Sequence, residues 1–355
     1  MNRVLSILIV LACLFTTQTS GAGLPDFHLQ VVPRVVYKVD DPGGARTSSF
    51  AFNIAVICST DCDLVPITAH ISLSSAGSLV ERQDWTAERL AKIKRESFRI
   101  ESNTPLASPT RAFTLPEAFD LRFYFRTLQA LQIDSATLRL TVADAKGRRT
   151  EQTLSIPIGY YKQKTTLSLP LRGLGVVGQD WITNGGHGGI WNAFALDLRG
   201  LDDNYAETKN GDYENASFAG WNREILAPAA GTVVYARDDV PTNPRPGKEP
   251  DNDWYAKLHD PVMAYAGNCV IIDHGNSEYS VIMHMQPGSL TVRVRDRVAA
   301  GQVVGRLGNS GDAFGPHVHY QLQSGPRLWQ DQSLPFRFQD ADDPPLSRGR
   351  YVHEK

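Results

Sequence analysis

Residues 137–142 have the sequence Thr-Leu-Arg-Leu-Thr-Val, a strict alternation of polar and apolar side chains. Successive side chains on a β-strand point to opposite faces, so this period of two predicts a strand with one buried face and one solvated face. Residues 145–147 (Ala-Lys-Gly) suit a turn, and residues 154–158 resume the alternation on a return strand. The two segments together predict an antiparallel hairpin within an all-β domain.

The N-terminal half of the chain holds further short runs of β-forming residues, at positions 28–37, 49–57 and 65–73. One helix is expected among them, with Asp84 as its N-cap, because an aspartate side chain can accept hydrogen bonds from the free amide groups of a first turn. Residues 24–165 contain no cluster of His, Asp or Glu that suggests catalysis. We therefore predict an immunoglobulin-like β-sandwich over residues 24–165, with a binding, spacing or occluding role.

Length and composition set broad limits. The chain has 355 residues, which suits two domains better than one. A hydrophobic content of 42% provides enough apolar material for real cores. The formal net charge of −2 offers no overall electrostatic reason to expect nucleic acid as a partner, so none is predicted.

The first residues are typical of an export signal. Residues 1–3 form a short positively charged start, residues 4–15 are almost unbroken apolar sequence, and residues 20–22 (Ser-Gly-Ala) fit a cleavage site. The apolar run is shorter than the about 20 residues of a membrane span. Attachment as a lipoprotein through Cys13 is the alternative, but the residues before it fit a lipobox poorly. We predict a signal peptide over residues 1–23 and a periplasmic or extracellular protein without stable membrane insertion.

Three cysteines remain after that signal. Export implies an oxidising compartment, so Cys58 and Cys62 could form a disulfide across a tight loop. Half of a metal site is the alternative, although no second cysteine pair accompanies them. Cys269 lies in an apolar run and is expected to be a buried core thiol.

From about residue 168 the pattern changes to frequent glycines and short strands between polar loops. This favours an antiparallel β-sheet domain over residues 168–335, with residues 336–355 as a C-terminal tail. Residues 236–266 are rich in Pro, Asp and Asn, which makes them improbable as core. Long loops of this kind in compact domains tend to be functional, so we expect a wall or lid of a site.

The strongest local signal for a site is a His-x-His pattern at His317 and His319. Residues two apart on a strand face the same side, so both imidazoles would point into one space. His284 ends another apolar strand, and Asp197 lies in an otherwise apolar run. A buried carboxylate needs a metal or an ionic partner, and a salt bridge from Asp197 to Arg199 is the simpler alternative.

The order of several sequence blocks resembles the lysostaphin/LytM-type zinc endopeptidases of peptidase family M23. The resemblance covers roughly residues 185–325 and no part of the N-terminal half. Several blocks in a fixed order are more specific than any one motif. The matching blocks are residues 194–197, 227–234, 267–275, 279–284, 298–305, 308–311 and 316–319.

The resemblance implies a LytM-type fold and a role for each matched residue. Asp197 and His319 would be ligands of one Zn²⁺ per chain, and His284 and His317 would be catalytic residues that do not bind the metal. Many members place a histidine four residues before the aspartate, where this chain has Ala193. His187, in a glycine-rich loop, is the nearest competent replacement and is predicted as the third ligand. Its alternative is a solvated loop residue beside an incomplete site.

Two imidazoles and one carboxylate would leave zinc an open position for water, as catalytic sites require. The chain has no HExxH motif and no GxSxG motif, so it offers neither the helix-borne Glu base of zincins nor a serine hydrolase elbow. Exported members commonly cut peptide cross-links of peptidoglycan, which implies peptidoglycan peptides as substrate. The first alternative is a degenerate module that binds peptidoglycan or regulates another cell-wall hydrolase. A biotinyl- or lipoyl-like carrier is the second, but it needs a hairpin lysine that is lacking here.

Overall fold

A computed structural model provides the structure of the protein. It describes residues 27–354 apart from 42–45, 59–62, 102–110, 190, 210, 248–253, 255–256, 259 and 342–345. The predicted signal peptide therefore lies outside the described residues. No helix in the described part is long and apolar enough to cross a membrane.

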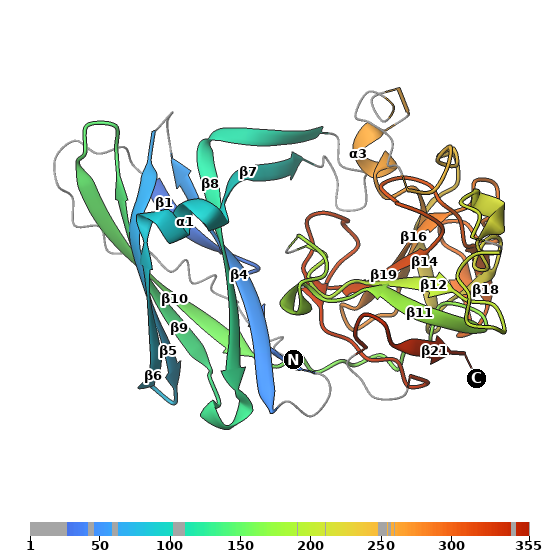
Figure 1. Ribbon diagram of the computed structural model, residues 1–355, viewed down its shortest axis with the longest axis horizontal. Coiled ribbons are helices and arrows are strands. Elements are labelled where there is room, and N and C mark those ends of the chain that lie inside the picture. The colour runs from blue at the N-terminus through green and yellow to red at the C-terminus, as the bar shows by residue number, and fades with distance from the viewer. Residues whose placement is uncertain are drawn as a thin grey trace, which may run out of the picture.

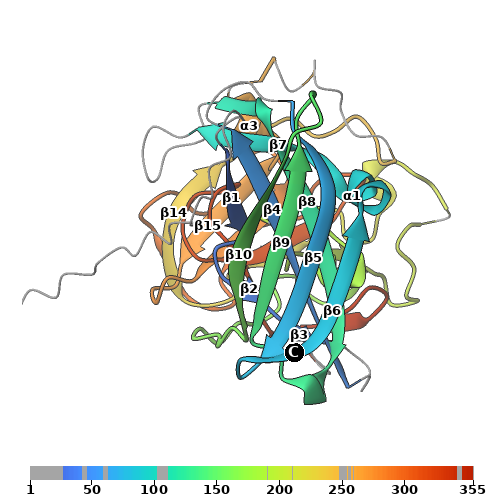
Figure 2. The ribbon, with the colours of Figure 1, turned by 90° about the vertical axis from the view of Figure 1, so that its left-hand side faces the viewer.

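The N-terminal half consists of two five-stranded sheets, seen edge-on in Figure 1 and face-on in Figure 2. The first sheet has the order β1 (Phe27–Val32), β4 (Thr47–Cys58), β8 (Arg111–Leu128) and β7 (Lys94–Glu101), with β3 (Val39–Asp40) also paired to β4. The second has the order β2 (Val36–Tyr37), β10 (Arg149–Gly159), β9 (Ser135–Ala143), β5 (Val65–Ser75) and β6 (Ser78–Thr86).

The hairpin predicted from alternation is present, because β9 and β10 pair antiparallel with Leu138 opposite Leu154. Leu138 and Leu140 are fully buried and belong to a core that also holds Phe52 and Phe125, whose ring centroids are 5.6 Å apart. The all-β prediction is thus confirmed for this half. The immunoglobulin-like assignment stays a prediction.

The predicted N-cap of the helix is wrong. Helix α1 (Ala87–Ile93) begins after Thr86, whose hydroxyl accepts a hydrogen bond from the Arg89 amide at 3.5 Å. Strand β6 continues to Thr86, so Asp84 lies within a strand directly opposite His70. Its carboxylate is hydrogen-bonded to Nδ1 of His70 at 2.5 Å instead of capping the helix.

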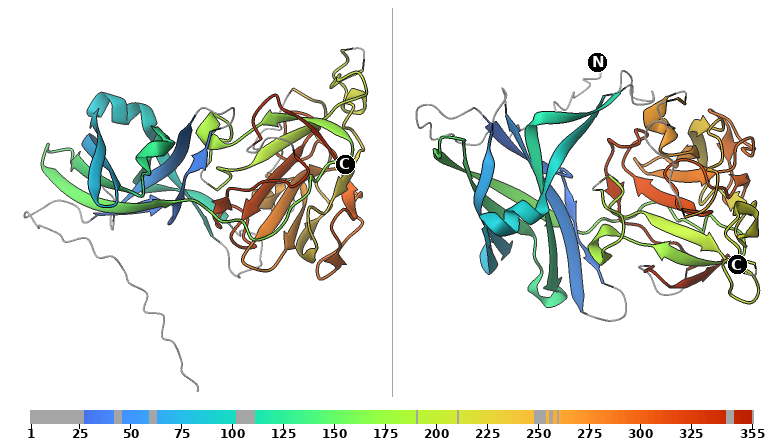
Figure 3. Two further views of the ribbon diagram at one scale, coloured as in Figure 1. Left: turned by 90° about the horizontal axis from the view of Figure 1, so that it is seen from below. Right: turned by 45° about the horizontal axis from the view of Figure 1, so that its top comes forward.

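The C-terminal half is built on a nine-stranded sheet, shown with the sandwich beside it in two further views in Figure 3. The sheet has the order β17 (Arg297–Val298), β14 (Gly231–Arg237), β15 (Asn268–Asp273), β16 (Tyr279–Met285), β19 (Val318–Gln323), β12 (Leu196–Gly200), β11 (Leu174–Gln179) and β21 (Tyr351–His353). Strand β20 (Ser333–Leu334) pairs with β19, and β13 (Glu224–Leu226) pairs with β18 (Val303–Arg306) in a separate small sheet. Short helices complete the fold: η1 (Gln129–Leu131), η2 (Ile182–Asn184), η3 (Asn215–Ser217) and α3 (Pro261–Ala264).

Two segments are more integrated than the sequence suggested. Residues 336–355 were expected as a tail, yet they provide β21 at the sheet edge and bury Phe336 and Phe338 in the C-terminal core. The segment 236–266 also contributes buried residues, among them Val240 and Met263. In both segments a few apolar side chains are buried, although the average composition of the segment is polar.

The two halves pack against each other. Val39 and Ala51 of the sandwich belong to the same buried cluster as the C-terminal core. The connecting segment is held by Glu278, which is fully buried and accepts hydrogen bonds from the Tyr161 hydroxyl at 2.5 Å and the Thr165 amide at 2.7 Å. The sandwich therefore has a defined position next to the C-terminal sheet.

Candidate metal centre and active-site pocket

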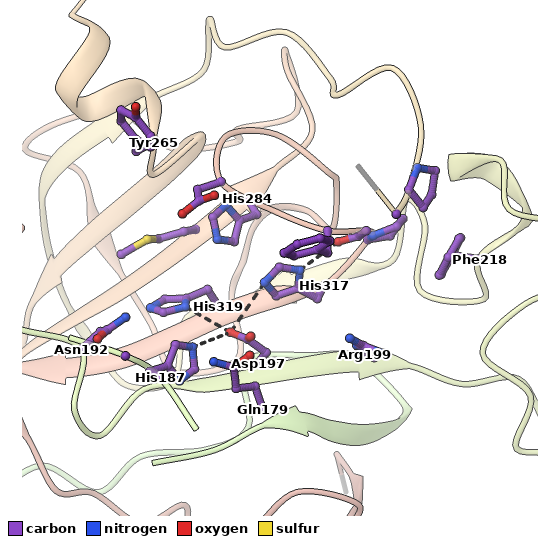
Figure 4. Close-up of a pocket in the computed structure, with 18 of the residues that line it drawn as sticks. Gln179, His187, Asn192, Asp197, Arg199, Phe218, Tyr265, His284, His317 and His319 are labelled. Atoms are coloured by element: carbon purple, nitrogen blue, oxygen red, sulfur yellow. Dashed lines mark hydrogen bonds and ion pairs between the residues drawn. The ribbon is translucent and has the colours of Figure 1, made fainter. Parts of the chain in front are cut away.

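Neighbouring strands bring the predicted site residues together. Strands β12 and β19 pair antiparallel with Asp197 directly opposite His319, and β16 lies on the other side of β19. His317 immediately precedes β19, and His284 lies near the end of β16. His187 comes from the loop after η2. All five predicted side chains converge in Figure 4.

Three of them form a group able to hold a metal ion. Nε2 of His187 and Nδ1 of His319 each lie 3.1 Å from Oδ1 of Asp197. One ligand atom from each residue lies within 4.8 Å of the other two. The structure thus places the His187 side chain beside Asp197, rather than in solvent.

The ring nitrogens of His187 and His319 that point away from Asp197 have partners that determine the tautomer of each imidazole. Nδ1 of His187 lies 3.0 Å from the carbonyl oxygen of Asp180, and Nε2 of His319 lies 3.2 Å from Oε1 of Gln321. A carbonyl oxygen can only accept, so each outer nitrogen carries the proton and each inner nitrogen carries a lone pair. Two lone pairs and a carboxylate oxygen around one point repel each other unless a cation lies between them, and this donor set suits Zn²⁺.

A chain of buried amides extends behind His319. Nε2 of Gln321 donates to Oε1 of Gln323 at 2.8 Å, and Nε2 of Gln323 donates to the carbonyl oxygen of Gly325 at 2.6 Å. Both glutamine residues are fully buried on β19. Because the chain ends on an obligatory acceptor, every amide in it is oriented, and Gln321 must offer its oxygen to His319. Sequence reasoning missed these residues, although Gln321 and Gln323 follow His319 at intervals of two on one strand, which places all three side chains on the same face.

His284 and His317 form a second pair beside the first group, with ring centroids 4.8 Å apart. Nδ1 of His284 donates to the Ser310 carbonyl oxygen and Nδ1 of His317 to that of Gly315, both at 2.8 Å. Nε2 of each ring is therefore the nitrogen with a lone pair, and that of His317 lies 3.6 Å from Oδ1 of Asp197. Burial lowers the pKa of both histidines, so both are neutral at pH 7.

Charge and strain are concentrated at this site. Burial by itself raises the pKa of Asp197, but its interactions with the imidazoles of His317, His187 and His319 outweigh burial and hold the pKa well below its usual range. His284 has a φ of 66°, in the left-handed region that non-glycine residues rarely adopt. Backbone strain of this kind costs about 1–3 kcal/mol and clusters at functional sites.

The five residues line a pocket of about 910 Å³. Pro246, Gly247 and Tyr265 line it as well, as expected for a segment that serves as the wall of a site. Arg122 of the N-terminal sandwich also reaches the pocket, and its guanidinium donates to the carbonyl oxygen of Gly188, next to His187. The sequence held no signal for Arg122, because only the packing of the two halves brings it there.

The remaining predictions for reactive side chains have mixed outcomes. Arg199 pairs with Glu207 at 3.2 Å, so the simpler explanation of Asp197 as its salt-bridge partner does not hold. Cys58 is disulfide-bonded, while Cys62 lies outside the described residues. Cys269 is a buried free thiol on β15, as predicted.

Comparisons with known proteins agree with this picture. Residues 216–330 match the profile of Peptidase family M23. A stretch of 58 residues is 41% identical to the peptidoglycan DD-endopeptidase ShyA of Vibrio cholerae, covering 16% of this chain and 13% of that protein. A stretch of 78 residues is 39% identical to the peptidoglycan DD-endopeptidase ShyC of the same organism, covering 20% of this chain and 18% of that protein.

Among solved structures, the catalytic domain of the M23 protein EnpA from Enterococcus faecalis is similar, with 22% identity over 45% of this chain and 88% of that one, at a TM-score of 0.26. The matched stretches of the two Vibrio proteins span less than a fifth of either relative. Fold and site together define an all-β protein with a His/Asp group that is able to hold a metal ion in a pocket of its C-terminal sheet. The match to Peptidase family M23 falls within that C-terminal domain. The matched range begins after His187 and Asp197, whose roles stay predictions.

Proposed function

We propose that this chain is an exported zinc-dependent endopeptidase that hydrolyses peptide bonds in peptidoglycan cross-links. The observation that supports it most is the arrangement around Asp197, with two inward lone pairs from His187 and His319. Two further neutral histidines lie on the pocket side of that group. The family match and the two peptidoglycan endopeptidases of Vibrio cholerae support the substrate class.

His187, Asp197 and His319 would hold the zinc ion, which supplies Lewis acidity toward a water molecule and the scissile carbonyl. Nε2 of His317 or His284 then takes a proton from the attacking water, since both rings are neutral and expose that lone pair. The ring that has accepted this proton then carries it as Nε2–H, which can hydrogen-bond the developing oxyanion or pass the proton to the leaving amine, and the two histidines share these roles. The hydrogen bonds to Ser310 and Gly315 keep both rings oriented for these transfers.

Digestion of purified sacculi by the protein without residues 1–23 tests the proposal, with mass spectrometry of the released fragments and zinc content measured by plasma emission. We expect about one zinc ion per chain and new peptide termini at cross-links. His319→Ala should lose both the metal and the products. Equal cutting by His319→Ala would overturn the zinc mechanism, and a protein that binds sacculi without zinc or cleavage would be the degenerate module instead.

Export has its own test. Expression of the full chain, followed by fractionation and N-terminal sequencing, should find the protein outside the cytoplasm with a start near residue 24. Retention in the cytoplasm with Met1 intact would contradict the predicted signal peptide.

A further inference from the structure

A second cavity lies between the sandwich and the C-terminal domain. Its volume is about 620 Å³, and it shares Arg122, Gly189, Trp191 and Trp329 with the wall of the active-site pocket. The two spaces therefore adjoin, and a chain-like ligand in one can continue into the other. No part of the proposed mechanism uses this second cavity.

The charge of the cavity wall is unbalanced. Four arginines line it (Arg34, Arg95, Arg122 and Arg327) against two aspartates, Asp120 and Asp331, which leaves a net formal charge of +2. Arg327 and Asp331 neutralise each other in an ion pair at 2.7 Å. The excess of positive charge therefore comes from the sandwich side, and it favours a ligand that carries carboxylates.

Hydrogen-bonding groups in the same wall lack partners among the described residues. Three buried donor nitrogens have none: Nε of Arg122, Nε1 of Trp329 and Nε2 of Gln330. Oδ1 of Asn53 is a buried acceptor in the same situation. Each unpaired buried group costs about 1–3 kcal/mol, so four in one wall need an explanation.

A peptide satisfies these groups, since its carbonyl and carboxylate oxygens accept and its amide groups donate. The donors lie beneath the cavity surface, so side-chain rotation must accompany binding. Trp191 and Trp329, whose ring centroids are 4.2 Å apart, add an apolar surface where the two spaces meet. This combination of positive charge, unpaired donors and aromatic rings is more typical of a peptide site than of a packed domain interface.

We infer that the interdomain cavity is a subsite for an acidic peptide segment. A carboxylate lies against Arg34 and Arg95, and the adjoining backbone passes Trp329 toward the group around Asp197. The sandwich thus contributes directly to substrate binding, which is one of the roles the sequence left open. The inference rests on the proposed function only in taking peptides as the substrate class.

The test removes charge from the cavity without touching Arg122, which also contacts Gly188 beside His187. The double variant Arg34→Ala/Arg95→Ala removes two exposed arginines of the cavity wall. The matched control, Arg139→Ala/Arg149→Ala, removes two exposed arginines from β9 and β10 of the other sheet. Thermal melts of all variants verify that they fold.

Two synthetic cross-linked peptides serve as probes, one with free carboxylates and one with every carboxylate amidated. Their dissociation constants are measured by calorimetry on the full-length mature protein with His317→Ala, which prevents turnover. We expect the carboxylated probe to bind at least about tenfold more tightly than the amidated one. The cavity variant should lose most of that preference, about tenfold, and the control should keep it.

The outcomes separate this inference from the proposed function. Equal binding of both probes, or an unchanged preference in Arg34→Ala/Arg95→Ala, overturns the subsite even if sacculi are cut. A carboxylate preference that depends on these arginines supports the subsite even if zinc-loaded protein releases nothing from sacculi, in which case only the proposed hydrolysis fails.

Discussion

The amide chain behind His319 leads to the sharpest prediction. Gln321→Leu replaces a fully buried amide by a side chain of similar size that cannot hydrogen-bond. It leaves Nε2–H of His319 without its acceptor, formerly at 3.2 Å, and Oε1 of Gln323 without its donor, formerly at 2.8 Å. With nothing to hold the proton on Nε2, the ring can shift it to Nδ1, the atom that faces Asp197.

Loss of such an outer partner typically lowers metal affinity about 10–100-fold. Two orphaned buried groups should also lower the free energy of unfolding by about 2–6 kcal/mol. Gln323→Leu should have a smaller effect on zinc, because Gln321 can still offer its oxygen to His319. Gln321→Glu should retain much of the affinity, since a carboxylate remains an acceptor toward His319.

Zinc dissociation constants come from competition with a chromophoric chelator, and the tautomer of His319 from ¹⁵N chemical shifts of the metal-free protein. Wild type should show the Nε2–H tautomer, and Gln321→Leu a mixture. The reasoning would be refuted by a stable, folded Gln321→Leu protein with unchanged zinc affinity and an unchanged tautomer.

Three further predictions concern other parts of the molecule. His284→Ala should retain zinc, because His284 is outside the ligand group, yet lower kcat on sacculi about 100-fold or more; loss of zinc with it would place His284 among the ligands. Glu278→Gln should destabilise the protein by about 2–4 kcal/mol near pH 7 in chemical denaturation. The carboxylate of Glu278 accepts through both oxygens from donors of residues 161–165, whereas a glutamine amide has only one oxygen that can accept. Burial by itself raises the pKa of Glu278, but these hydrogen bonds lower the pKa on balance. The carboxylate therefore stabilises the fold fully above its pKa in the unfolded chain. The difference in unfolding free energy between wild type and Glu278→Gln should disappear as the pH falls through the pKa in the folded protein. Chelator treatment should lower the unfolding free energy by about 2.7 kcal/mol relative to protein in zinc at 100 times its Kd, and an identical melting curve would argue against a metal at His187, Asp197 and His319.

Local pattern was enough for much of the fold and for part of the site. Alternation at residues 137–142 led to β9 correctly, because a half-buried strand imposes a period of two wherever it lies. The His-x-His spacing likewise placed His317 and His319 in one space. The prediction of Asp84 as the helix N-cap was wrong because Asp84 pairs across two strands with His70, and this pairing outweighs the preference of aspartate for an N-cap position.

The position of the His187 side chain could not be predicted from local sequence pattern. Its role was inferred only because Ala193 cannot bind a metal, and nothing in the loop sequence required the side chain to reach Asp197. The hydrogen bond to Asp180 and the packing of η2 against β4 orient that loop, and both join residues that sequence spacing does not relate.

The sequence alone determined the all-β class, the sheet domain at the C-terminus and the His and Asp residues competent for metal chemistry, because strand period and ligand type are local properties of the chain. Tertiary structure decided the rest. The antiparallel register of β12 and β19 sets Asp197 beside His319, and the packing of the sandwich brings Arg122 to the pocket. These depend on contacts between residues 66 to 122 positions apart, which the folded packing of the chain establishes.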